Sequence, residues 1–178
     1  MVTTSTRIPS RPAAPRFRWW HALGIFAAAN AVSVLPAGVG GDEAFYNDFE
    51  RPAVAPPDWL FAPMWLFLNV TSLIALARVA NDPEQTGDHR RIYVLEGSGW
   101  VLFAAFNTLY FGLRSPVLGA ADTAAGLAVG AVSLVYSLKV DRRAGLLILP
   151  RVLWLLLATY VSASVARHNR DEFLSRRN

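Results

Sequence analysis

The chain has 178 residues, of which 53% are hydrophobic and 17% charged. A charged fraction well below the roughly 25% of soluble domains excludes an ordinary soluble protein, and the six tryptophans and ten phenylalanines exclude low-complexity disorder. The absence of cysteine excludes disulfide frameworks, thiolate metal sites and cysteine nucleophiles. The formal net charge of +4 comes from arginines at the chain ends and in short loops. This distribution is typical of membrane topology and unlike the contiguous basic face that binds nucleic acid.

Residues 1–18 carry three prolines, four arginines and few apolar side chains, which predicts a disordered basic tail. Five apolar stretches follow, each close to the length of about 20 residues that a helix needs to cross a hydrocarbon core of roughly 30 Å. They cover residues 21–39, 59–80, 92–113, 117–138 and 144–166. Such runs are too long for strands, and they lack the alternation of an outer-membrane barrel. The sequence therefore predicts an all-α integral membrane protein, a bundle of five transmembrane helices in residues 19–169, followed by a polar tail at 170–178.

The connections between the predicted spans are short, except for residues 40–58. This loop carries five acidic side chains and one basic one, and a loop of such length without a helical pattern is often functional, for example as a lid. Tight hairpins at 114–116 and 139–143 make the last three spans antiparallel neighbours. Ten Lys and Arg lie on the side of the N-terminus and six on the other side. This count predicts an N-terminus inside and a C-terminus outside the cell membrane.

Polar side chains inside the predicted spans are the sharpest candidates for a site. Placing a charged side chain at the centre of a membrane helix costs on the order of 2.5–3.5 kcal/mol of free energy, unless the side chain is paired or faces the interior of the bundle. Asn107 lies six residues before the end of the third span, and Asp122 lies five residues after the start of the fourth. The tight hairpin places them at the same depth, where they could hydrogen-bond. We interpret the pair as a structural clasp or as ligand contacts, two roles that are compatible.

Two further features leave alternatives open. Glu96 and Arg151 lie at similar depths near the inner ends of their spans, so they either form an ion pair or reach the interface separately. Gly126-x-x-x-Gly130 permits close helix approach, within the bundle or in a homodimer.

Three segments resemble the TspO/MBR family, which comprises the tryptophan-rich sensory proteins, translocator proteins and peripheral-type benzodiazepine receptors. They are residues 45–65 (FYNDFERPAVAPPDWLFAPMW), 106–109 (FNTL) and 141–158 (DRRAGLLILPRVLWLLLA). The resemblance covers about residues 24–169 and implies a five-helix bundle of the TspO type. Arg151 stands where the family has a tyrosine, so an ion pair with Glu96 is peculiar to this chain.

The resemblance implies a receptor-like or translocator-like membrane protein. Its ligand is a tetrapyrrole of the protoporphyrin IX type, haem, or a similar flat or sterol-like molecule, held in a pocket inside the bundle and linked to porphyrin transport, sensing or homeostasis. Trp65 and Trp154 then stack on the macrocycle, and the loop over residues 40–58 folds over the pocket mouth. The full set of implied ligand-binding residues is Tyr46, Pro56, Pro57, Trp65, Asn107, Asp122, Trp154 and Ala158.

Two other functions compete with this one. An enzyme that degrades porphyrin with light and oxygen would act through Trp65 and Trp154, and a structural membrane partner would use the face of Gly126 and Gly130. All three histidines lie at or beyond the ends of the spans and cysteine is absent, which predicts no axial haem ligand, no metal site and no required cofactor.

Overall fold

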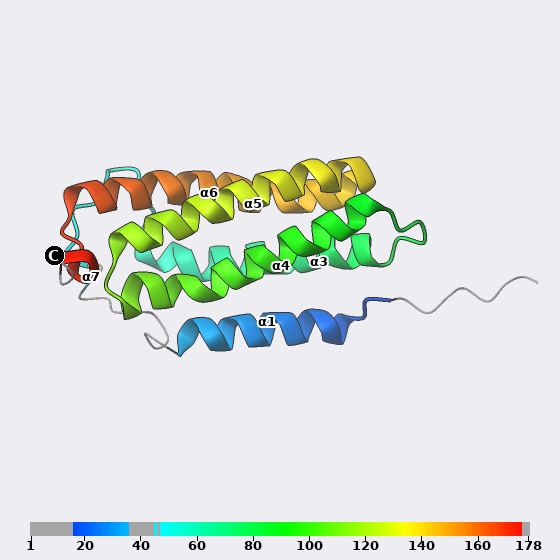
Figure 1. Ribbon diagram of the computed structural model, residues 1–178, viewed down its shortest axis with the longest axis horizontal. Coiled ribbons are helices and arrows are strands. Elements are labelled where there is room, and N and C mark those ends of the chain that lie inside the picture. Colours follow the sequence, from blue (N-terminus) through cyan, green and yellow to red (C-terminus); the bar gives the residue numbers. More distant parts are fainter. Residues whose placement is uncertain (1–15, 36–44, 46, 176–178) are drawn as a thin grey trace, which may run out of the picture.

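The computed structural model describes residues 16–35, 45 and 47–175, and its regular structure there is helical. Five long helices run up and down the bundle (Figure 1): α1 (Trp19–Val34), α3 (Phe61–Ala80), α4 (Gly87–Asn107), α5 (Pro116–Val140) and α6 (Arg142–His168). Among the described residues there are also three short elements: the 3-10 turn η1 (Asp58–Leu60) before α3, the π-helical turn η2 (Thr108–Gly112) that continues α4, and α7 (Glu172–Ser175).

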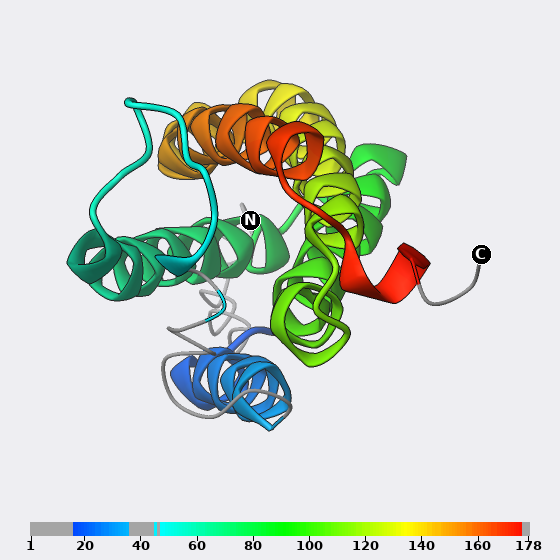
Figure 2. The same cartoon turned by 90° about the vertical axis from the view of Figure 1, so that its left-hand side faces the viewer.

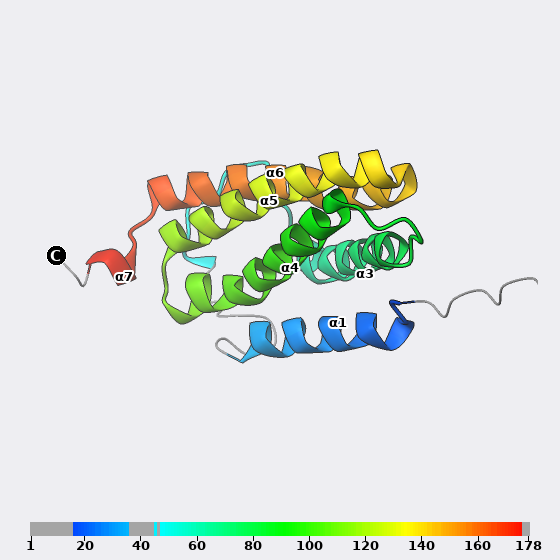
Figure 3. The same cartoon turned by 45° about the vertical axis from the view of Figure 1, so that its right-hand side comes forward.

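The long helices form a ring in the order α1, α3, α6, α5 and α4 (Figure 2). The loop before η1 is described at residues 45 and 47–57. It lies at the same end of the bundle as α7 and the α4–α5 turn. We call this end the α7 end, and the opposite end the N-terminal end. Figure 3 shows α1 running along the edge of the bundle beside α3 and α4. Its buried Ala29 clusters with Leu73 of α3 and Trp100 of α4, and the half-buried Ala22, Ile25 and Phe26 of α1 pack against this cluster.

Within the described residues, four helices are long and apolar enough to cross a membrane: Asp58–Ala80, Gly87–Gly112, Pro116–Val140 and Arg142–Ser175. These helices agree with the prediction of an α-helical integral membrane protein, and four of the five predicted spans have the length and composition that it requires. The described part of α1 has 16 residues. It rises about 24 Å at 1.5 Å per residue, which is short of the hydrocarbon core of roughly 30 Å. The prediction of a fifth span at 21–39 extends outside the described residues and stays a prediction.

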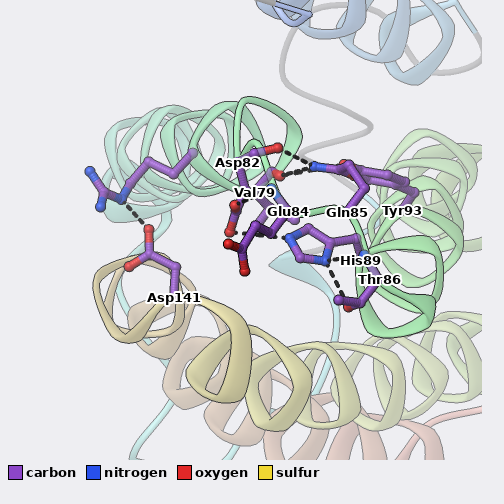
Figure 4. Close-up of polar contacts among 9 residues, drawn as sticks. Val79, Asp82, Glu84, Gln85, Thr86, His89, Tyr93 and Asp141 are labelled. Atoms are coloured by element: carbon purple, nitrogen blue, oxygen red, sulfur yellow. Dashed lines mark hydrogen bonds and ion pairs between the residues drawn. The ribbon is translucent and has the colours of Figure 1, made fainter. Parts of the chain in front are cut away.

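The start of α4 differs most from its predicted boundary, because the helix begins at Gly87 and not at residue 92. Thr86 and His89 form a capping box in which the Thr86 amide donates to His89 Nδ1 at 3.0 Å (Figure 4). His89 is only 3% exposed, and its Nε2 lies 3.3 Å from Asp82 Oδ2. A search for apolar runs misses this polar first turn, because the turn is stabilised by capping and not by hydropathy.

The small residues of α5 pack within the chain. A Cβ built on Gly126 would lie 3.7 Å from Leu155 Cδ2, and one on Gly130 would lie 3.6 Å from Val152 Cγ2. These glycines therefore face α6 and allow the two helices to approach closely. Of the two roles that the Gly-x-x-x-Gly spacing left open, the structure shows packing inside the bundle.

A salt bridge joins α3 to the α5–α6 turn at the N-terminal end. Arg78 Nε donates to Asp141 Oδ2 at 2.7 Å (Figure 4). Asp141 Oδ1 accepts the Arg143 amide at 2.8 Å and so caps α6. Partial burial raises the pKa of Asp141, but the hydrogen bonds from the Arg143 amide and the Arg78 guanidinium outweigh it. This pKa therefore lies below its ordinary value of 3.8.

We expect Asp141→Ala to lower the free energy of unfolding by about 1–2 kcal/mol, because it removes a helix cap and a partly exposed ion pair. Since the folded pKa is lowered, the carboxylate's contribution is complete above the unfolded pKa and is lost as the pH falls through the folded pKa. Asp141→Asn, which keeps an oxygen for the cap, should lose this acid-dependent part. Denaturant unfolding in detergent at several pH values measures both effects, and an Asp141→Ala variant as stable as the parent would contradict them.

Candidate functional site

One face of α3 brings aromatic side chains from three helices together. Phe61 and Trp65 are four residues apart and therefore share a helix face. The Phe61 ring lies 5.7 Å from that of Trp154 on α6, and the Trp65 ring lies 5.2 Å from that of Phe103 on α4. Phe103 in turn contacts Trp100, with ring centroids 5.8 Å apart. We call these five residues the interior aromatic group. Of the two implied stacking residues, Trp65 lies on α3 and Trp154 contacts Phe61, which is one turn away from Trp65 on the same helix.

Two indole N–H groups of the interior aromatic group are buried without a hydrogen-bond partner. Trp100 is 9% exposed and Trp154 8% exposed, and neither Nε1 meets an acceptor among the described residues. A buried donor left unpaired costs on the order of 1–3 kcal/mol, and buried indole N–H groups usually find a partner. These donors are therefore available to a polar atom that enters the interior.

Asp122 on α5 is a third unsatisfied group. It is 7% exposed, and its Oδ1 has no hydrogen-bond partner within the described part of the chain. Gly126 packs against Leu155, so one turn further toward the α7 end Asp122 lies level with Ala158. Ala158 is half-buried and shares a face of α6 with Trp154, four residues before it.

The suggested hydrogen bond between Asn107 and Asp122 is not formed. Asn107 is the last residue of α4 and is half-buried, and in the described residues its side chain makes no hydrogen bond to Asp122. The two positions were matched in depth on the assumption of a regular helix. The π-helical turn η2 follows Asn107 directly and changes the rotation of α4 relative to α5 before the hairpin.

Tyr110, in η2, is a residue that sequence analysis did not assign to the site. It is 4% exposed, stacks on Phe106 at 5.4 Å, and makes edge contacts with Phe45 at 5.9 Å and Phe49 at 6.1 Å. Gly119 makes room for it, because a Cβ there would lie 2.4 Å from Tyr110 Cδ2. Tyr110 therefore connects the loop before η1 to the bundle. The aromatic run at 106–111 was the available signal.

Two of the predicted loop residues line a cavity whose walls include none of the interior aromatic group. Pro56 and Pro57 border a surface cavity of about 550 Å³, and neither Trp65 nor Trp154 lines it. An ion pair of 2.8 Å between Arg51 and Asp58 joins two residues of the same cavity wall. Tyr46 lies outside the described residues.

A buried ion pair lies on the N-terminal side of the interior aromatic group. Arg151 binds Glu96 through both guanidinium ends, with Nη1–Oε2 at 2.9 Å and Nη2–Oε1 at 2.5 Å, and Ser133 Oγ donates to Glu96 Oε1 at 2.6 Å. Glu96 is 1% exposed and Arg151 8% exposed. The pairing that sequence analysis left open is confirmed, and the alternative of separate contacts with the interface is wrong. Trp100 lies one turn beyond Glu96, and Trp154 lies one turn beyond Arg151.

We expect Glu96→Ala to lower the free energy of unfolding by about 3–5 kcal/mol, because it leaves the Arg151 charge buried and unpaired. The double variant Glu96→Met with Arg151→Leu should recover most of this loss, since it removes both charges and keeps apolar volume. Thermal unfolding in detergent compares the two. If the single variant unfolded like the parent chain, the pair would not be buried as the structure places it.

The described geometry is that of a polytopic α-helical membrane protein in which Trp65, Trp100 and Trp154 each contact a phenylalanine at another position of the bundle, next to a buried ion pair. Comparison with known proteins agrees with this class. A model of the TspO/MBR family matches residues 22–167. The chain therefore belongs to the TspO/MBR family, and the resemblance in its motifs is confirmed.

Several relatives match over most of their length. A tryptophan-rich sensory protein of Cereibacter sphaeroides is 28% identical over 160 residues, which are 85% of this chain and 92% of the relative. The protein CrtK of Rhodobacter capsulatus is 27% identical over 159 residues, covering 84% and 94%. A tryptophan-rich protein TspO of Chlorobaculum tepidum is 26% identical over 125 residues, covering 70% and 79%.

Proposed function

We propose that this protein binds tetrapyrroles of the protoporphyrin IX type, or similarly flat apolar molecules, among the residues of the interior aromatic group, in the service of porphyrin transport, sensing or homeostasis. The observation that carries the proposal is the α3 face, where Phe61 and Trp65 contact Trp154 and Phe103. The family supports it, and the sensory name of one relative favours a signalling role.

The chemistry of the interior suits a macrocycle with an apolar face and a polar centre or rim. Indole rings offer flat apolar surface for stacking. The N–H groups of Trp100 and Trp154 are donors, and Asp122 Oδ1 is an acceptor, and all three are buried without partners in the described structure. A ligand that satisfies them removes a desolvation cost that the protein otherwise bears. The rings are packed against one another here, so entry of the ligand requires them to separate.

We expect Trp65→Phe and Trp154→Phe each to weaken protoporphyrin IX binding about threefold to tenfold, because each removes indole stacking area. The double variant should also lose most of the fluorescence quenching that the porphyrin causes. Trp19→Phe is the control, because Trp19 is 76% exposed on α1. Unaltered quenching in the double variant would show that the ligand lies elsewhere.

Titration with haem and with a sterol on the same proteins ranks the ligand classes. A new absorbing product after illumination of the protoporphyrin complex would favour porphyrin degradation instead.

We expect Asp122→Ala to weaken protoporphyrin binding about tenfold, whereas Asp122→Asn largely spares it. The reason is that Asn keeps the shape and the acceptor oxygen and removes only a charge that is costly in the bundle. A porphyrin titration and a thermal melt on both variants check this. If Asp122→Ala bound and melted like the parent, Asp122 would have no part in the site.

The same proposal places the protein in the cell membrane with the α7 end outside. It rests on the ten Lys and Arg on the side of the N-terminus against six on the other side. In this proposal lipid surrounds the four candidate spans, and association into a homodimer would use a surface other than the Gly126 and Gly130 face.

A further inference from the structure

Asn169, the residue that ends α6, pairs with the main chain of the loop before η1. The Glu50 amide donates to Asn169 Oδ1 at 2.9 Å, and Asn169 Nδ2 donates to the Glu50 carbonyl at 3.0 Å. The same Nδ2 also donates to the Val165 carbonyl at 2.9 Å, so the side chain is anchored on its own helix. One amide thus joins the loop to the end of α6, 119 residues away.

Asp171 holds the next part of this segment on the α4–α5 turn. Its Oδ2 accepts Ser115 Oγ at 2.6 Å and the Val117 amide at 3.1 Å, and its Oδ1 accepts the Leu174 amide at 2.8 Å. Ser115 is fully buried and caps α5 by accepting the Leu118 amide. A single carboxylate therefore satisfies amides at the starts of both α5 and α7.

Arg114 connects the turn, the segment and the loop. Its Nε lies 3.0 Å from Glu172 Oε2, and its guanidinium carbon lies 4.4 Å from the centroid of the Phe45 ring. Its φ of 52° is in the left-handed region, which costs a residue with a Cβ roughly 1–2 kcal/mol. The turn keeps this conformation while the Arg114 side chain contacts both Glu172 and Phe45.

A cavity of about 460 Å³ lies among these contacts. Its walls come from the loop, the α4–α5 turn and the segment after α6: Phe45, Asp48, Phe49, Arg114, Asn169, Arg170, Glu172 and Ser175. In Figure 2 the loop crosses the end of the bundle between α3 and α6, and α7 lies to one side. The contacts that Asn169 and Glu172 make at this end are polar and partly exposed, whereas Phe45 and Phe49 contact the buried Tyr110. Breaking the polar contacts can therefore loosen this end locally while the packed helices stay folded.

We propose that residues 169–175 form a strap that holds the loop before η1 closed over the α7 end and thereby sets how fast a ligand enters and leaves the bundle. The proposal rests on the ligand site proposed above, and the hydrogen bonds and ion pair of the strap described here go to the loop and to the α4–α5 turn. A closure that does not touch the ligand changes the rates of association and dissociation by the same factor. It leaves their ratio, the dissociation constant, unchanged.

The test uses the full chain in detergent micelles and the double variant Asn169→Ala with Glu172→Gln. Protoporphyrin IX binding is followed by stopped-flow quenching of tryptophan fluorescence. Both rate constants should rise about fivefold or more through the loss of two hydrogen bonds and an ion pair, with the dissociation constant within about twofold of the parent value. Asn81→Ala is the matched control. Asn81 makes the same two-pronged pair with the Phe17 main chain at the N-terminal end, with both distances at 2.9 Å, and its removal should leave both rates unchanged.

A second measurement needs no ligand. Amide hydrogen exchange at residues 47–58 should be faster in the double variant and unchanged in Asn81→Ala. Unchanged exchange in the double variant overturns the strap, and faster exchange with unchanged porphyrin rates overturns its control of entry. Equal effects from Asn81→Ala would also overturn it, because the contacts at the α7 end would then have no special role. If the parent chain binds no protoporphyrin, the proposed function fails, and the exchange experiment alone decides whether the strap exists.

Discussion

The bundle depends on one pair of charges placed where water does not reach. Glu96 and Arg151 form two hydrogen bonds with each other, and Ser133 takes up a further lone pair of the carboxylate, so three helices are joined at one level. Desolvation makes such a pair a weak source of stability, but it makes any other arrangement of these helices expensive, because a rotated or shifted helix would bury an unpaired charge. The pair thus specifies how α4 and α6 face each other. It also sets the direction of Trp100 and Trp154, one turn away on the same helices.

Both ends of the bundle are closed by polar contacts. At the N-terminal end Arg78 and Asp141 join α3 to the α5–α6 turn, and Asn81 binds the main chain just before α1. At the α7 end Asn169 binds the loop that follows α1. The side-chain amides of two asparagines, each ending a long helix, therefore hold the chain on either side of α1. This anchoring matters for α1, because its described residues pack on the bundle through a small cluster around Ala29.

The sequence predicted well what hydropathy and depth determine, and it missed what local hydrogen bonding determines. Apolar runs located α3, α5 and α6 to within about two residues, an ordinary error for helix ends. Counting residues from the inner ends brought Glu96 and Arg151 to one level, since both helices are regular over that distance. The same counting failed for Asn107 and Asp122, because the π-helical turn lies between Asn107 and the hairpin. The start of α4 and the contacts of residues 169–175 rest on caps and side-chain pairs, which leave no periodic pattern to detect.

The contact of the Asp171 carboxylate with α5 affects the order in which the parts of the fold are completed during synthesis. Val117 leaves the ribosome 54 residues before the side chain that accepts its amide. During that interval Ser115, which accepts the Leu118 amide, caps the first turn of α5 without the Asp171 carboxylate. Elements near the N-terminus generally form first during synthesis, but here the end of an early helix is completed by a late one. A truncation or fusion close to residue 171 would therefore alter a helix whose own sequence it leaves intact.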